Sequence, residues 1–273
     1  MNSREIALGN EILRGVVGST AHGTAVDGQD DRDEMGIFIE PPEYVCGLSS
    51  CDHYIYRDKP EGVRSEAGDL DLTMYSLRKF CRLAEQGNPS VVILLWLPTH
   101  EAKTELGAGL VEMREAFISR ESGDRFLGYL VAQRMKMTGQ RNQTVNRPEL
   151  VAKYGFDTKF AMHAMRLAFE GIEMLVRRTI TLPVAEPNLS ILRGIRTGKY
   201  TKDETLRMID TAEMQLRELL KDCDWKTDRA RINAFMVKAH TTHWQSRVNS
   251  RVGRRAVDAD TAVRVCEPGP QDR

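Results

Sequence analysis

The segment GSTAHGT at residues 18–24 and the segment DRDEMGIFI at residues 31–39 decide the fold of this chain. Gly18 and Gly23 in the first segment permit tight turns, and the N–H and hydroxyl groups of Ser19 can donate hydrogen bonds to phosphate oxygens. Asp31 and Asp33 are two residues apart on a predicted strand, so both carboxylates project to one face and can share a hard divalent cation. Together the segments predict a phosphate and metal site at the end of a sheet.

Each of these signals also has an ordinary structural explanation. A Gly-Ser turn after a strand is a common connection, and a charged run such as residues 30–34 usually belongs to a solvated surface. The order and spacing of the two segments favour the phosphate and metal site.

A third carboxylate comes from residues 69–75. On a strand, Asp69, Asp71 and Thr73 share one face, so either aspartate can meet the first two carboxylates across neighbouring strands. We favour Asp71, because it lies farther from the preceding polar loop at residues 60–68. The alternative is that both aspartates keep an edge strand soluble.

The composition is that of an ordinary globular protein. The chain has 273 residues, 41% hydrophobic and 29% charged, with 39 basic and 39 acidic side chains, so no overall field indicates a nucleic-acid binder. The N-terminus lacks an apolar signal core, and the longest apolar run, residues 91–97, is too short to cross a bilayer. We therefore expect a cytoplasmic protein with no membrane partner.

The five cysteines form no CxxC pair, which favours reduced thiols. Cys46, Cys51 and His53 are an alternative zinc site, but no second ligand pair lies nearby in the sequence.

The two halves of the chain differ in periodicity, which predicts an α+β fold. In the first half, strands are expected at residues 12–17, 35–39 and 69–75, and helices over 77–84 and 90–96. In the second half we expect helices only, at residues 105–118, 123–138, 156–178 and 203–220. The predicted organisation is a catalytic core at residues 1–104, a helical domain at 105–265 and a flexible tail at 266–273.

A ridge of polar side chains is predicted on the helix that begins near residue 157. At 100° per residue, its members fall within roughly 60° of one another; they are Lys159, His163, Arg166 and Glu170. The guanidinium and ammonium groups suit the phosphates of a nucleotide. The alternative is a polar stripe that faces water.

Taken in order, these segments resemble the DNA polymerase β-type nucleotidyltransferase superfamily. The fuller set is similar to the predicted nucleotidyltransferases associated with RNA-ligase repair operons and with phages, over about residues 18–192. The matching segments are Gly18-Ser19-x-Ala21-His22-Gly23, Asp31-x-Asp33-x-x-Gly36, Asp71 with Leu77-Arg78-Lys79-Phe80, Gly87-Asn88-Pro89, and Tyr154-x-x-Asp157-x-Lys159-x-x-x-His163-x-x-Arg166-Leu167.

The resemblance implies a small mixed β-sheet flanked by helices, followed by an all-helical C-terminal domain that closes the nucleotide cleft. It implies transfer of a nucleoside monophosphate from an NTP such as ATP to a hydroxyl acceptor, with RNA as a candidate acceptor and pyrophosphate as the leaving group. The implied catalytic and metal-binding residues are Asp31, Asp33 and Asp71, with two Mg²⁺ ions, or Mn²⁺ in their place. The implied nucleotide-binding residues are Gly18, Ser19, His22, Lys159, His163 and Arg166.

Three positions depart from the pattern of these relatives. Asp30 replaces a polar residue, Met35 stands where a basic residue is common, and Ile93 occupies the neighbourhood of a glutamate. An alternative function is a catalytically inactive nucleotide-sensing or antitoxin-like binding module. The presence of all three acidic residues favours the enzyme.

The only compositional support for an RNA partner lies at residues 229–257, which hold seven basic and no acidic side chains. The stretch can follow an RNA backbone through Arg247, Arg251, Arg254 and Arg255, with Trp244 stacking on a base. In the competing interpretation, the stretch is a solvated helix whose Trp244 ring packs into the core. The oligomeric state stays open.

Overall fold

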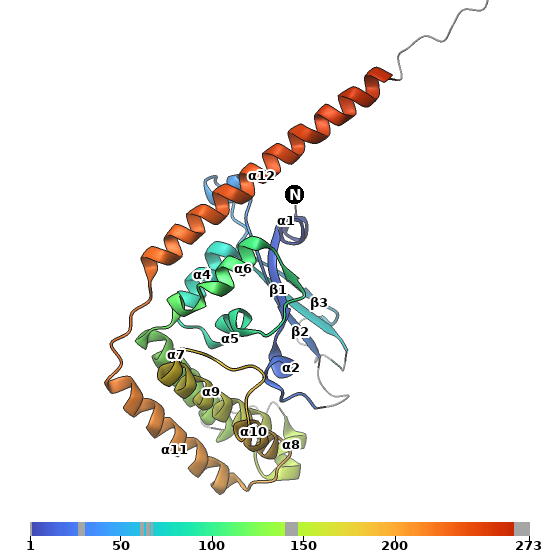
Figure 1. Ribbon diagram of the computed structural model, residues 1–273. Helices are drawn as coiled ribbons and strands as arrows, with labels where there is room; N and C mark the ends of the chain where they lie inside the picture. The colour runs from blue at the N-terminus through green and yellow to red at the C-terminus, as the bar shows by residue number, and fades with distance from the viewer. Residues whose placement is uncertain are drawn as a thin grey trace, which may run out of the picture.

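A computed structural model describes residues 2–26, 31–60, 63, 66, 68–139 and 147–264, with side chains as far as residue 247. It contains a five-stranded sheet in the order β3-β4-β2-β1-β5 (Figure 1). β2 pairs with β4 in parallel and the other neighbours are antiparallel, so the predicted mixed sheet is confirmed. The strands are β1 Glu11–Val16, β2 Arg32–Phe38, β3 His53–Arg57, β4 Leu70–Ser76 and β5 Ala102–Lys103.

Helices surround the sheet and form nearly all of the second half of the described chain, so the predicted α+β class is also confirmed. The helices of the first half are α1 Ser3–Gly9, α2 Gly18–His22, α3 Pro42–Val45, α4 Leu77–Glu85 and α5 Pro89–Val92. Those of the second half are α6 Glu105–Glu112, α7 Arg120–Met137, α8 Pro148–Tyr154, α9 Thr158–Arg177, α10 Asn188–Arg196, α11 Lys202–Lys221 and α12 Arg229–Arg264.

Two of the predicted helices are wrong in part, because each ends in a 3-10 turn. Residues 90–96 form α5 and then η1, Ile93–Trp96, and the chain becomes extended at Leu97, which precedes a proline that disfavours helix there. Residues 105–118 form α6 and then η2, Arg114–Phe117.

The two faces of the sheet are buried against different helices. On one face, Met35 and Ile37 pack against the large core shared with the helices from α4 onward. On the other face, Phe38 and Met74 pack with Ile6 of α1 in a smaller core. Side chains alternate along a strand, so the residues of β2 and β4 on either side of Phe38 and Met74 in the sequence point to the opposite face of the sheet.

The helices α7, α9, α10 and α11 form a bundle beside one end of the sheet (Figure 1). The predicted start of α9 is confirmed, because the Asp157 carboxylate accepts hydrogen bonds from the backbone N–H groups of Lys159 and Phe160 at 3.0 and 3.1 Å. No helix within the described ranges is long and apolar enough to span a membrane.

Helix α12 returns from the bundle to the sheet and passes beside α4 (Figure 1). Trp244 is half-buried, and its indole N–H donates to the carbonyl oxygen of Glu40 at 2.8 Å. His240 lies 3.4 Å from the Glu40 carboxylate. The Trp244 ring therefore packs against the protein, as expected if the basic stretch is a solvated helix with Trp244 turned toward the core. The side chains of Arg251, Arg254 and Arg255, and the predicted tail at 266–273, lie outside the described residues.

Docking of α6 on β1 generates a stability prediction. A Cβ atom at Gly107 would lie 2.1 Å from the carbonyl oxygen of Ile12, whereas one at Gly128, exposed on α7, would meet nothing within 4 Å. We expect Gly107→Ala to lower the free energy of unfolding by about 1–3 kcal/mol, because the backbone of β1 must shift. Gly128→Ala should raise it by about 0.5–1 kcal/mol through helix propensity.

Urea denaturation of the two variants beside the wild type measures both changes. Equal stability of Gly107→Ala and Gly128→Ala would contradict the close contact between α6 and β1.

Candidate active site

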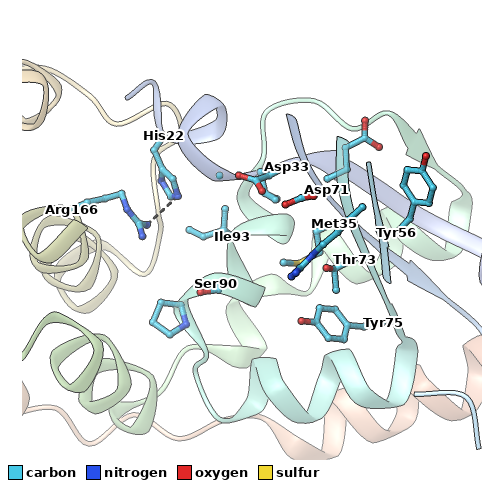
Figure 2. A pocket seen from close by; sticks show the side chains of 15 residues that line it. His22, Asp33, Met35, Tyr56, Asp71, Thr73, Tyr75, Ser90, Ile93 and Arg166 are labelled. Carbon is cyan, nitrogen blue, oxygen red and sulfur yellow. Dashed lines mark hydrogen bonds between the residues drawn. The ribbon is translucent and has the colours of Figure 1, made fainter. Parts of the chain in front are cut away.

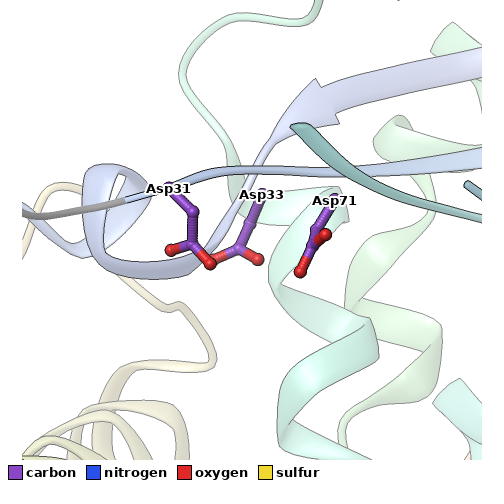
Figure 3. Close-up of side chains that lie close together, drawn as sticks. All are labelled: Asp31, Asp33 and Asp71. Atoms are coloured by element: carbon purple, nitrogen blue, oxygen red, sulfur yellow. The ribbon is translucent and has the colours of Figure 1, made fainter. Parts of the chain in front are cut away.

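Three carboxylates converge at one end of the sheet (Figure 3). The parallel register places Asp33 of β2 beside Asp71 of β4, and Asp31 lies two residues before Asp33, so it shares that face. One carboxylate oxygen from each residue lies within 4.8 Å of the others. Among the described residues this is the only group of three or more side chains placed to hold a metal ion, so Cys46, Cys51 and His53 do not form one.

Asp69, the alternative third acid, lies in the preceding loop. Its carboxylate accepts a hydrogen bond from the backbone N–H of Glu66 at 2.7 Å. It therefore stabilises the loop and is absent from the carboxylate group.

The three half-buried carboxylates fit a divalent cation. Three negative charges this close repel one another, and a bound cation relieves that repulsion. All three donors are hard oxygen ligands, which suits Mg²⁺ or Mn²⁺ better than softer metals.

The Gly-Ser turn packs directly against this group. Gly18 begins the short helix α2 with φ +65°, and a Cβ atom there would lie 2.0 Å from Oδ2 of Asp33. The backbone N–H of Val17 donates to the carbonyl oxygen of Asp33 at 2.9 Å. The absence of a side chain at position 18 therefore lets the turn and the carboxylate occupy adjacent space.

His22, at the end of α2, connects the turn to helix α9. Its Nδ1 lies 2.7 Å from Oε1 of Glu170, and Nη1 of Arg166 lies 3.0 Å from its Nε2. The same Nη1 donates to Oε2 of Glu170 at 2.8 Å. His22 and Glu170 are only 6% and 2% exposed, so the three side chains form a buried charged cluster between the sheet and the bundle.

The charge states within this cluster follow from its surroundings. Burial lowers the pKa of His22, and the positive charge of Arg166 adds to that effect against the opposing influence of Glu170. Burial alone would raise the pKa of Glu170, but Arg166 and His22 outweigh it and lower the pKa. A neutral imidazole that accepts at Nε2 from Arg166, with its proton on Nδ1 beside the Glu170 carboxylate, fits these distances.

His163 lies on the same ridge of α9, and it is half-buried. Burial lowers its pKa well below the usual value, and the positive charges of Arg166 and Lys159 lower it further. The imidazole is therefore neutral at neutral pH. The ridge is not a wholly solvated stripe, because Glu170 at its end is buried.

A cavity of about 330 Å³ lies between the sheet and α9 (Figure 2). Five of the predicted site residues line this cavity: Gly18, His22, Asp33, Asp71 and Arg166. The other four are not among its lining residues: Ser19, Asp31, Lys159 and His163. Two of the three positions that depart from the family pattern, Met35 and Ile93, also line it, and both are buried. Asp30 lies outside the described residues.

Sequence reasoning missed part of the lining. Arg57 lies on β3, a strand that was not predicted, and Tyr75 and Ser90 were given no role. The run HYIYR at residues 53–57 is rich in aromatic and β-branched side chains, and that composition was the signal for this strand.

Comparison with known families identifies the chain. Residues 7–238 match the family described as the RNA repair pathway DNA polymerase beta family. The chain belongs to this family. It is thus a nucleotidyltransferase of the polymerase beta type, as the resemblance implied.

A comparison with solved structures finds a nucleotidyltransferase-like protein from Exiguobacterium sibiricum 255-15. The two chains are 11% identical over 80% of this chain and 71% of the other, with a TM-score of 0.30, a superposition too poor to support an argument. No protein of curated function matches the chain.

The carboxylate group predicts a metal-dependent stability. At a Mg²⁺ concentration about 100-fold above its Kd, we expect the wild type to gain about 2.7 kcal/mol, seen as a higher Tm. Asp71→Asn should lose most of this gain. With EDTA the variant should be as stable as the wild type or more so, because it removes one of three mutually repelling charges.

Asp69→Asn is the matched control, since it changes a neighbouring aspartate outside the group and should keep the full Mg²⁺ effect. A wild-type Tm that does not respond to Mg²⁺ or Mn²⁺ would contradict the assignment.

A second prediction concerns Gly18. Gly18→Ala must accept a left-handed backbone conformation and displace the Asp33 carboxylate, so it should lower stability and weaken the Mg²⁺ effect on Tm. Gly155→Ala is the control, because Gly155 has φ +81° but open space around it. It should cost about 1–2 kcal/mol and leave the Mg²⁺ effect intact. The same Mg²⁺ response in both variants would refute the role of the close approach.

Proposed function

We propose that this protein transfers a nucleoside monophosphate from an NTP to a hydroxyl acceptor and releases pyrophosphate. The observation that carries the proposal is the convergence of three carboxylates beside the Gly18–His22 turn, next to a cavity that two of them, Asp33 and Asp71, line together with Arg166. In this proposal residues 1–104 supply the catalytic core, and the helical residues 105–265 close the nucleotide cleft.

The proposed donor site lies between the turn and α9. Phosphate oxygens accept hydrogen bonds from the N–H groups of the turn at Gly18 and Ser19 and from the guanidinium of Arg166. Arg166 is held in place by Glu170 and His22, while its buried Nε has no hydrogen-bond partner among the described residues. The guanidinium is therefore oriented in advance of a ligand.

Lys159 and His163 complete the proposed phosphate site. Their positions on α9 place them on the same ridge as Arg166, and the neutral imidazole of His163 can donate a hydrogen bond without adding charge. Lys159 supplies a second positive charge on that ridge.

In the proposed reaction, the acceptor oxygen forms a bond to the α-phosphorus as the bond from that phosphorus to the bridging oxygen breaks. The hydroxyl proton passes to a carboxylate, for which Asp71 is the candidate. When bound by Asp31, Asp33 and Asp71, two Mg²⁺ or Mn²⁺ ions would neutralise phosphate charge and favour deprotonation of the hydroxyl.

We propose RNA as the acceptor. The family description, which names an RNA repair pathway, supports this choice. The basic residues of α12 are a further candidate contact for RNA.

Incubation with each α-³²P-labelled NTP, Mg²⁺ and an RNA oligonucleotide tests the proposal. We expect label on the RNA, and a loss of at least about a hundredfold in Asp31→Ala, because one of the three metal ligands is removed. Asp69→Asn should retain activity. NTP binding without transfer to RNA, to protein or to a small hydroxyl compound would instead support the inactive binding module.

A further inference from the structure

The cavity has a second end, on the side of the carboxylates away from Arg166. There β3 and β4 form a ladder in which facing residues share the carboxylate face of the sheet. The facing pairs are Arg57 with Asp71, Ile55 with Thr73, and His53 with Tyr75. Arg57, Thr73 and Tyr75 also line the cavity.

Arg57 is the unusual member of this ladder. It is exposed, and it has no ion-pair partner among the described residues. By contrast, Arg14 and Arg32 on the opposite face are both paired with Glu34. The positive charge of Arg57 repels a cation bound by the neighbouring Asp71. A ligand with a negative charge, such as a phosphodiester, would offset this repulsion and make the position of Arg57 favourable.

The remaining ladder positions offer flat or apolar contacts. Ile55 is 49% exposed, although it is a large aliphatic side chain on an open strand face. Tyr75 is half-buried, and burial raises its pKa, so the phenol stays protonated and can donate a hydrogen bond. Proteins bind unstacked nucleotides with this kind of surface, in which an apolar side chain, an aromatic ring and a guanidinium lie side by side.

The geometry of the proposed transfer assigns a different ligand to each end of the cavity. In-line displacement requires the incoming hydroxyl and the leaving pyrophosphate to lie on opposite sides of the α-phosphorus. Figure 2 shows Asp33 and Asp71 between His22 and Arg166 on one side and Thr73 and Tyr75 on the other. With the phosphates beside Arg166, the acceptor approaches from the ladder.

We propose that the ladder of β3 and β4 binds the acceptor, and that this acceptor is the end of a single-stranded nucleic acid. Arg57 would contact the phosphodiester next to the reacting hydroxyl, while Ile55 and Tyr75 contact a sugar and a base. This inference rests on the proposed nucleotidyl transfer, and it assigns β3 a role in recognising the substrate.

Binding of a fluorescent twelve-nucleotide RNA, measured by anisotropy over a range of salt concentrations without NTP, tests the ladder. Arg57→Gln should raise the Kd on the order of tenfold and reduce the slope of log Kd against log salt by about one, because one phosphate contact is lost. The Tm increase caused by NTP and Mg²⁺ should stay unchanged, which shows that the donor site and the fold are intact.

Two further variants sharpen the result. Arg82→Gln removes an exposed arginine on α4, outside the cavity, and should bind RNA as the wild type does. Arg57→Lys keeps the charge and should restore the salt slope and part of the affinity.

The failure of this inference is distinguishable from failure of the proposed function. Wild-type RNA affinity and salt slope in Arg57→Gln would overturn the ladder, as would transfer of label to a polypeptide at the wild-type rate in that variant. Binding of RNA that depends on Arg57, without transfer of label to any acceptor, would support the surface and refute the transferase.

Discussion

The parallel pairing of β2 with β4 is the constraint on which the candidate active site depends. The register that places Asp33 beside Asp71 also places Phe38 beside Ser76 and Gly36 beside Met74. Because side chains alternate, a shift of one residue would turn the Asp71 carboxylate toward the apolar core around Phe38. Burial of Phe38 and Met74 on one face therefore fixes where the carboxylates lie on the other, and it offsets their mutual repulsion.

A second set of contacts brings the helical half to this end of the sheet. The guanidinium of Arg193 donates two hydrogen bonds to the carbonyl oxygen of Gly23, at 3.0 and 2.8 Å. The backbone N–H of Val184 donates to the carbonyl oxygen of His22. These join α2 to the bundle close to the buried cluster of His22, Arg166 and Glu170. The turn beside the three carboxylates and the arginine proposed to bind phosphate are thus held by one network.

Sequence periodicity predicted the features that depend on local geometry. The alternation along residues 69–75 placed Asp71 and Thr73 on one face, and the spacing along α9 placed Arg166 and Glu170 together, because both periods are intrinsic to the backbone. The pairing of Glu170 with His22 could not be predicted in this way, since 148 positions separate them and only the packing of α2 on α9 brings them together. The same holds for Trp244 and Glu40. Strand β3 was missed because its side chains are mostly exposed, so its apolar signal is weak.

We propose that Asp31, Asp33 and Asp71 form a single divalent-cation site, and the proposed mechanism depends on it. A crystal grown with Mn²⁺ tests it most directly, because anomalous scattering locates the ion independently of any assumption about ligands. We expect an anomalous peak with oxygens of all three carboxylates in its coordination shell. A peak that excludes Asp71, or no peak at this end of the sheet, would contradict it.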